Sequence, residues 1–138
     1  VYTMELKIQH IGLCVKNIDE YVAKMDKVFG CKEVKNRLHI PRAGQTSALV
    51  EMGNGNYFEL MEPIGEEGVV PKFLATKGEG FHHIGVYCDD PVALGKQLVE
   101  NGIKILGDPA SGGFFVAPKS AGGVLYEISS TKDLEREV

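Results

Sequence analysis

The stretch Gln9-His10-Ile11-Gly12-Leu13 returns past the middle of the chain as His82-His83-Ile84-Gly85-Val86. Each copy is followed by a short apolar run with one acid, Tyr57-Phe58-Glu59-Leu60 in the first half and Leu125-Tyr126-Glu127-Ile128 in the second. Glu59 follows His10 by 49 residues, and Glu127 follows His83 by 44. The repeat predicts two copies of one small unit, each of which offers a His and a Glu.

Apolar periodicity predicts the same order of elements, β-α-β-β-β, in both halves. The first half is expected to contain strands over 7–15, 32–39, 46–52 and 56–62, with a helix from Asn17 or Asp19 to about Phe29. The second is expected to contain strands over 81–88, 103–107, 114–117 and 124–130, with a helix over about 91–101. A short helical segment is expected over 69–77, and Gly53-Asn54-Gly55 predicts a hairpin turn.

The predicted fold class is α+β, with two tandem β-α-β-β-β modules that form a curved mixed sheet lining a cleft. Residues 1–138 are expected to form a single domain. Module one covers about 7–62, a linker covers 63–79, and module two covers about 80–130.

Strand parity predicts where the repeated His and Glu point. Side chains alternate between the two faces of a strand, so His10 lies opposite Ile11 and Leu13, and Glu59 lies opposite Phe58 and Leu60. The same alternation holds around His83 and Glu127. Each of four strands therefore carries one ionisable group on the face that a helix does not cover.

Two imidazoles and two carboxylates on one face suit a single divalent metal ion. A carboxylate in a half-buried cleft is costly unless it is paired or bound to a metal, and two Glu neutralise a divalent cation. The predicted ligands are His10, Glu59, His83 and Glu127. Nitrogen and oxygen donors of this kind suit Co, Zn, Ni, Mn or Fe, and the set does not choose among them.

Composition limits the remaining classes of function. The net charge is −4, with 15 basic and 19 acidic residues, so no basic surface for nucleic acid is expected. No apolar stretch reaches the roughly 18 residues of a membrane span, and the N-terminus has no signal-peptide profile. Three cysteines, Cys14, Cys31 and Cys88, lie in apolar contexts, which favours free thiols in a reducing cytoplasm over disulfides.

From about residue 7 to 130 the chain resembles the vicinal-oxygen-chelate superfamily, which contains glyoxalase I, extradiol dioxygenases and methylmalonyl-CoA epimerases. The most specific strings resemble the epimerases. They are Gly80-Phe81-His82-His83-Ile84 and Pro118-Lys119-Ser120-Ala121-Gly122-Gly123-Val124-Leu125-Tyr126-Glu127. The resemblance implies paired modules around one metal held by His10, Glu59, His83 and Glu127, with His82 structural. It also implies a homodimer.

In the epimerases that the chain resembles, the metal binds oxygens of a malonyl-type acyl-CoA thioester and stabilises the enolate formed when the α-proton leaves. The resemblance gives Glu127 an acid or base role in that proton transfer. The phosphates of CoA would need nearby cations, for which Arg42, Lys72, Lys77 and Lys119 are candidates.

Three positions depart from the epimerase pattern. Ser47 stands where the family has a second carboxylate, and Ala117 stands where it has a His before Pro-Lys. The loop 108–113 is shorter than usual. Glu51 lies on the same face as Ser47 by parity, although a solvated strand position explains it more simply.

Two other functions remain open at this stage. A glyoxalase I-like lyase acting on a thiol–aldehyde adduct uses the same kind of ligand set, whereas extradiol dioxygenases present two His and one Glu. A small-molecule-binding resistance protein of the same fold would need no proton-transfer group, and the departures at Ser47 and Ala117 leave this alternative open.

Overall fold

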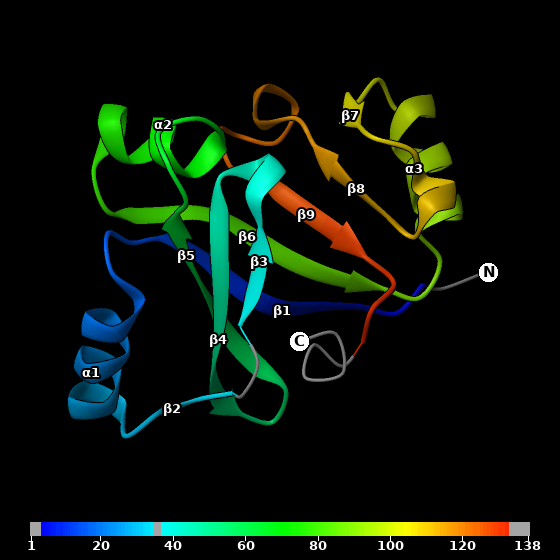
Figure 1. Ribbon diagram of the computed structural model, residues 1–138. Helices are drawn as coiled ribbons and strands as arrows, with labels where there is room; N and C mark the ends of the chain where they lie inside the picture. The colour runs from blue at the N-terminus through cyan, green and yellow to red at the C-terminus, as the bar shows by residue number, and fades with distance from the viewer. Residues whose placement is uncertain (1–3, 35–36, 133–138) are drawn as a thin grey trace. The chain divides into compact units, whose positions relative to one another are not determined.

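The computed structural model describes residues 4–34 and 37–132 and contains three α-helices and a mixed arrangement of strands (Figure 1). The described residues divide into two compact units, one made of 4–10 and 83–132 and the other of 11–34 and 37–82. Strands β1 (Leu6–Cys14) and β6 (Gly80–Cys88) each run from one unit into the other. The predicted α+β class with a mixed sheet is confirmed.

The unit of residues 11–82 is built around the hairpin of β4 (Gln45–Gly53) and β5 (Asn56–Pro63). Asn54 and Gly55 both have positive φ, 55° and 75°, as the predicted tight turn requires. The two short strands β2 (Lys32–Glu33) and β3 (Leu38–Ile40) both pair with β4 in antiparallel fashion.

The single strand predicted over 32–39 is wrong. Lys32 lies opposite Glu51 and Leu38 lies opposite Ser47, so six residue steps on one side match only four on β4. Because the register changes between these pairs, continuous pairing is impossible, and the segment forms two strands instead of one. Residues 35 and 36 of the predicted strand lie outside the described residues.

Two helices of this unit cover opposite faces of the hairpin. Helix α1 (Ile18–Phe29) buries Ile18 and Met25 against Ala48, Val50 and Leu60. Helix α2 (Val69–Lys77) buries Val70 against Met61 and Cys14. The predicted start and end of α1 are confirmed, because the Asn17 side chain accepts a hydrogen bond from the Glu20 N–H and Gly30 ends the helix at φ 69°.

The unit of residues 83–132 joins a parallel pair of strands to an antiparallel pair. Strand β6 pairs in parallel with β9 (Tyr126–Ser129), which pairs antiparallel with β8 (Gly113–Val116). Strand β7 (Ile105–Leu106) pairs antiparallel with β8 and is shorter than the predicted 103–107. Strand β9 is also shorter than the predicted 124–130.

Helix α3 (Pro91–Glu100) covers one face of this unit and forms its core with the strands. Its Leu94 and Leu98 pack in one cluster with Cys88, Phe114 and Ile128. The described residues also form 3₁₀ turns at Pro41–Ala43, Pro109–Ser111 and Pro118–Ser120. The last charged residues of the sequence, 133–138, lie outside the described residues.

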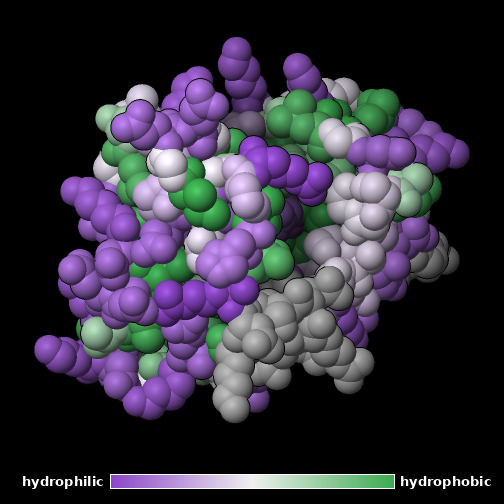
Figure 2. Space-filling model, viewed as in Figure 1, coloured by the Kyte–Doolittle hydropathy of each residue, from purple (hydrophilic) through white to green (hydrophobic). Residues whose placement is uncertain are grey.

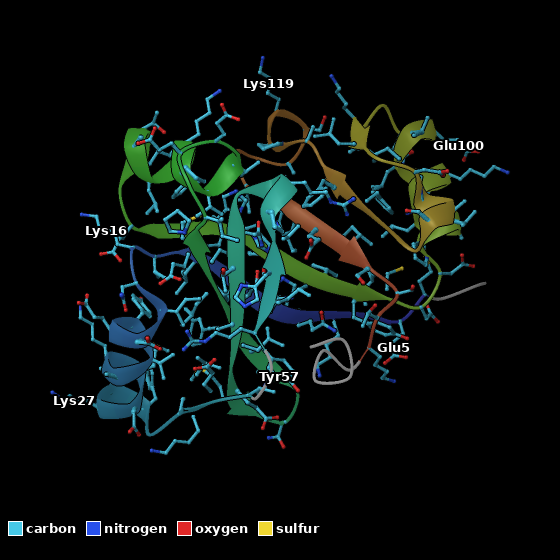
Figure 3. All side chains as sticks on the ribbon, viewed as in Figure 1. Glu5, Lys16, Lys27, Tyr57, Glu100 and Lys119 are labelled. Atoms are coloured by element: carbon cyan, nitrogen blue, oxygen red, sulfur yellow. The ribbon has the colours of Figure 1, made fainter. Side chains whose placement is uncertain are left out.

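The face seen in Figure 2 is dominated by hydrophilic residues, and the charged side chains of Lys27 on α1 and Glu100 on α3 extend away from the ribbon in Figure 3. None of the described helices has the length and apolar character needed to cross a membrane.

Candidate metal centre

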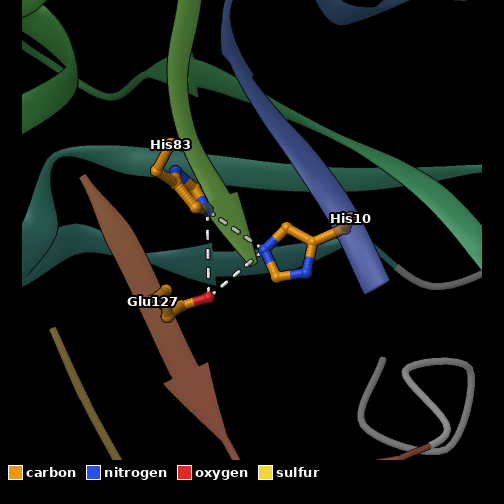
Figure 4. A group of neighbouring side chains, drawn as sticks. All are labelled: His10, His83 and Glu127. Atoms are coloured by element: carbon orange, nitrogen blue, oxygen red, sulfur yellow. Dashed lines mark hydrogen bonds and ion pairs between the residues drawn. The ribbon is translucent and has the colours of Figure 1, made fainter. Parts of the chain in front are cut away.

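Two histidines and one glutamate meet in the unit of residues 4–10 and 83–132 (Figure 4). His10 Nε2 lies 3.0 Å from His83 Nε2 and 3.2 Å from Glu127 Oε1. His83 Nε2 lies 3.8 Å from the same oxygen. The His10 and His83 side chains are almost fully buried, whereas the Glu127 side chain is 35% exposed, so the cluster is reachable from one side.

Strand register places His83 and Glu127 on the same face. In the parallel β6–β9 pair, Gly85 lies opposite Glu127, and His83 precedes Gly85 by two residues. Residues that alternate with them, Val86, Tyr126 and Ile128, point into the core under α3. The parity prediction for His83 and Glu127 is therefore confirmed, and the reason is the aliphatic face that α3 buries.

Gly85 makes the room that the His10 ring occupies. A Cβ built on Gly85 would lie 1.9 Å from His10 Cε1, 2.2 Å from Nδ1 and 2.3 Å from Nε2. No side chain fits at that distance, so the imidazole of the first repeat packs directly on the bare backbone of the second. The glycine of the repeated His-Ile-Gly string thus has a steric function at the centre.

The three described ligand atoms fit one divalent ion. Two ligands with metal bonds of about 2.1 Å are at most about 4.2 Å apart, and all three separations, 3.0, 3.2 and 3.8 Å, are shorter. Imidazole nitrogen and carboxylate oxygen suit Zn, Fe, Co, Ni or Mn. His10, His83 and Glu127 would hold such an ion.

Glu59, the fourth predicted ligand, belongs to the unit of residues 11–82 and not to the unit that contains His10, His83 and Glu127. Its membership of the ligand set therefore stays a prediction. Phe58 and Leu60 pack into the core under α1, which places Glu59 on the opposite face of β5. The pKa of the Cys14 thiol is raised to about 11, mainly by burial and also by the negative charge of Glu59.

The structure also describes the surroundings of Ser47, Glu51, His82 and the three cysteines. Ser47 is buried, and its hydroxyl accepts a hydrogen bond from the Gln45 side chain at 2.7 Å. Glu51 is half-buried on β4 opposite Tyr57. His82 packs edge-on against Phe73 of α2, and its structural role stays a prediction. All three cysteines are free and buried.

Sequence reasoning missed two residues at the centre. Gln9 is 2% exposed, and its side-chain oxygen lies 3.3 Å from His10 Nδ1. The apolar periodicity of the strand does not predict this contact, because Gln9 is a single polar residue in it. Gly85 was visible as part of the repeat, but its steric function depends on which ring packs against it.

The mixed sheet with its three helices, as the described residues form it, is the fold of the vicinal-oxygen-chelate class of proteins. Residues 9–117 match the Glyoxalase/Bleomycin resistance protein/Dioxygenase superfamily, and the chain belongs to that superfamily. The family predicted from the repeated strings is confirmed.

The relatives within the superfamily include epimerases. An ethylmalonyl-CoA/methylmalonyl-CoA epimerase of Cereibacter sphaeroides is 28% identical over 130 residues, which cover 88% of this chain and 96% of the relative. The structure of a hypothetical protein from Bacillus halodurans C-125 has a TM-score of 0.82 at 30% identity and covers 93% of this chain and 96% of its own.

A solved Streptomyces coelicolor methylmalonyl-CoA epimerase variant, in complex with 2-nitronate-propionyl-CoA, is also similar. It has a TM-score of 0.75 at 30% identity and covers 88% of this chain and 94% of its own. The chain is thus similar over most of its length to enzymes that act on acyl-CoA.

The contact between Gly85 and His10 predicts a strong coupling between the two positions. Gly85→Ala should lower the free energy of unfolding by about 1–3 kcal/mol, the usual cost of overpacking. In a His10→Ala background the same change should cost far less, because the ring that it strikes is gone. Urea unfolding of the four proteins measures the coupling. Equal losses in both backgrounds would contradict the contact.

The raised pKa of Cys14 predicts a loss of stability at alkaline pH. The folded protein holds the thiol proton up to about pH 11, whereas an unperturbed thiol has a pKa of 9.0, so the unfolded state loses its proton first. Stability from this group is complete below pH 9.0 and falls as the pH rises towards about 11. Urea unfolding across this range should show a steeper decline for wild type than for Cys14→Ala, and parallel declines would refute the shift.

Proposed function

We propose that the protein is a divalent-metal-dependent epimerase that moves the α-proton of a malonyl-type acyl-CoA thioester. The observation that carries the proposal is the convergence of His10, His83 and Glu127 within 4.8 Å, in a chain whose relatives include methylmalonyl-CoA epimerases. Co, Zn, Ni, Mn and Fe all remain possible ions for this donor set.

The proposed ligand set is His10, Glu59, His83 and Glu127, of which Glu59 is supported by its place in the repeat, its strand face and the family resemblance. A divalent ion held there would supply positive charge for the enolate oxygen that develops as the α-proton leaves. The two buried imidazoles set the geometry, because their strands and the Gly85 backbone restrict how the rings can move.

Glu127 is the proposed acid or base. Its side chain is 35% exposed, so it is open to a substrate in a way that the buried His10 and His83 are not. As a carboxylate it accepts the α-proton from the substrate carbon, and as the carboxylic acid it gives the proton back. Epimerisation also requires a proton donor on the opposite face of the enolate, and Ser47 cannot be a carboxylate base there.

Lys119 is a candidate contact for the CoA phosphates. It lies exposed in the 3₁₀ turn Pro118–Ser120, which precedes the strand that carries Glu127, and Figure 3 shows its side chain extending into solvent. An ammonium group in this position can pair with phosphate without a desolvation cost. A homodimer remains a proposal that rests on the family resemblance.

Metal binding tests the ligand set. Glu127→Gln, His83→Ala and Glu59→Gln should each weaken Co²⁺ binding by at least about tenfold, the scale that outer-shell changes already reach. Glu100→Gln and His39→Ala, at exposed positions on α3 and β3, are matched controls that should bind as wild type does. Isothermal titration of metal-free protein with Co²⁺ measures the affinities. If Glu59→Gln alone binds Co²⁺ as wild type does, Glu59 is not a ligand and the centre has three protein ligands.

Proton transfer tests the reaction. In D₂O, the Co²⁺-loaded protein should introduce deuterium at C2 of methylmalonyl-CoA, and Glu127→Gln should slow this exchange by about 10²–10⁴-fold. Proton NMR or mass spectrometry of the thioester follows the exchange, with Glu100→Gln as the control. A fully metal-loaded wild-type protein that exchanges no deuterium would refute the epimerase proposal.

A further inference from the structure

Gln9 connects the first histidine of the centre to the chain after β9. Its amide nitrogen donates to the backbone carbonyl oxygens of Thr131 at 2.6 Å and Lys132 at 3.0 Å. Its amide oxygen lies 3.3 Å from His10 Nδ1. The side chain is among the most deeply buried in the described part of the protein.

These contacts leave only one orientation for the Gln9 amide. A backbone carbonyl oxygen only accepts hydrogen bonds, so the NH₂ end of the amide must face Thr131 and Lys132. The oxygen end must then face His10, and an amide oxygen also only accepts. The hydrogen bond therefore needs a proton on His10 Nδ1, which leaves the lone pair of the neutral ring on Nε2.

The resulting tautomer suits metal binding. His10 Nε2 is the atom that lies 3.0 Å from His83 Nε2 and 3.2 Å from Glu127 Oε1. With the proton on Nδ1, the lone pair of His10 Nε2 faces Glu127 Oε1. Both atoms are electron-rich, and a cation between them stabilises the arrangement. Metal-binding histidines commonly donate their second ring N–H to such a partner, which fixes ring and tautomer together.

We infer that Gln9 is a positioning residue for the metal centre, which holds His10 in the Nδ1–H tautomer and so presents Nε2 to a divalent ion. The value of this tautomer for metal binding rests on the proposed function, whereas the tautomer itself rests on the Gln9 contacts alone. Gln suits the position because it donates to two carbonyls and accepts from the imidazole, both at once. Leu can do neither, and an ionised Glu can only accept.

Two substitutions separate positioning from simple anchoring. Gln9→Leu removes the acceptor for His10 and the donor for Thr131 and Lys132. Gln9→Glu, at a pH where the carboxyl is ionised, keeps the acceptor and loses the donor. Gln97→Leu, at an exposed position on α3, is a matched control.

Long-range ¹H–¹⁵N NMR of the metal-free protein reads the tautomer directly, with the His10 signals assigned by their absence in His10→Ala. The spectrum is recorded at mildly alkaline pH, where imidazole is neutral. Wild type, Gln9→Glu and Gln97→Leu should show His10 protonated at Nδ1, and Gln9→Leu should show a mixture or the Nε2–H form. A wild-type His10 protonated at Nε2 would overturn the inference.

Co²⁺ titration of the same proteins measures the consequence. Gln9→Leu should bind Co²⁺ about 10–100-fold more weakly than wild type, the range for partners of metal ligands, and Gln9→Glu should retain most of the affinity. Equal losses in Gln9→Leu and Gln9→Glu would show that anchoring of residues 131–132 matters instead, and would overturn the positioning role. A wild-type protein that binds no Co²⁺ refutes the proposed function, while the NMR result still decides the tautomer.

Discussion

The packing of the His10 imidazole on the bare backbone of Gly85 is the contact on which the candidate centre depends. Only the absence of a Cβ at Gly85 lets the ring approach so closely that its Nε2 lies 3.0 Å from that of His83. Glu127 lies opposite Gly85 in the parallel β6–β9 register, so its side chain is on the same face as that of His83. The missing side chain at Gly85 thereby leaves room for the close approach of His10 to His83 and Glu127.

Burial makes this arrangement demanding, because each polar group taken out of water needs a partner. His10, His83 and Gln9 are all nearly inaccessible, and within residues 4–34 and 37–132 no buried side-chain nitrogen or oxygen lacks a hydrogen-bond partner. Gln9 meets this demand with both ends of its amide at once. The polar contacts that stabilise the fold around His10 are therefore the same contacts that orient it.

Local signals predicted much of the fold, and they failed where pairing depends on distant strands. The Asn17 cap, the Gly30 stop and the Asn54-Gly55 turn were predictable because each acts within a few residues of chain. The strand predicted over 32–39 was wrong, because a change of register against β4 is invisible in the segment's own composition. The shorter β7 and β9 have the same origin, since strand ends depend on the length of the partner.

The sequence by itself determined the strand face on which His83 and Glu127 lie, because alternation along a strand is a local property that aliphatic neighbours reveal. It also determined the superfamily, since the strings 80–84 and 118–127 are specific enough to resemble one family. Tertiary structure alone decided that His10 joins the unit of His83 and Glu127, although 73 residues separate the two histidines. It also decided the steric function of Gly85 and the orientation of Gln9, because both depend on atoms that only strand pairing brings within contact distance.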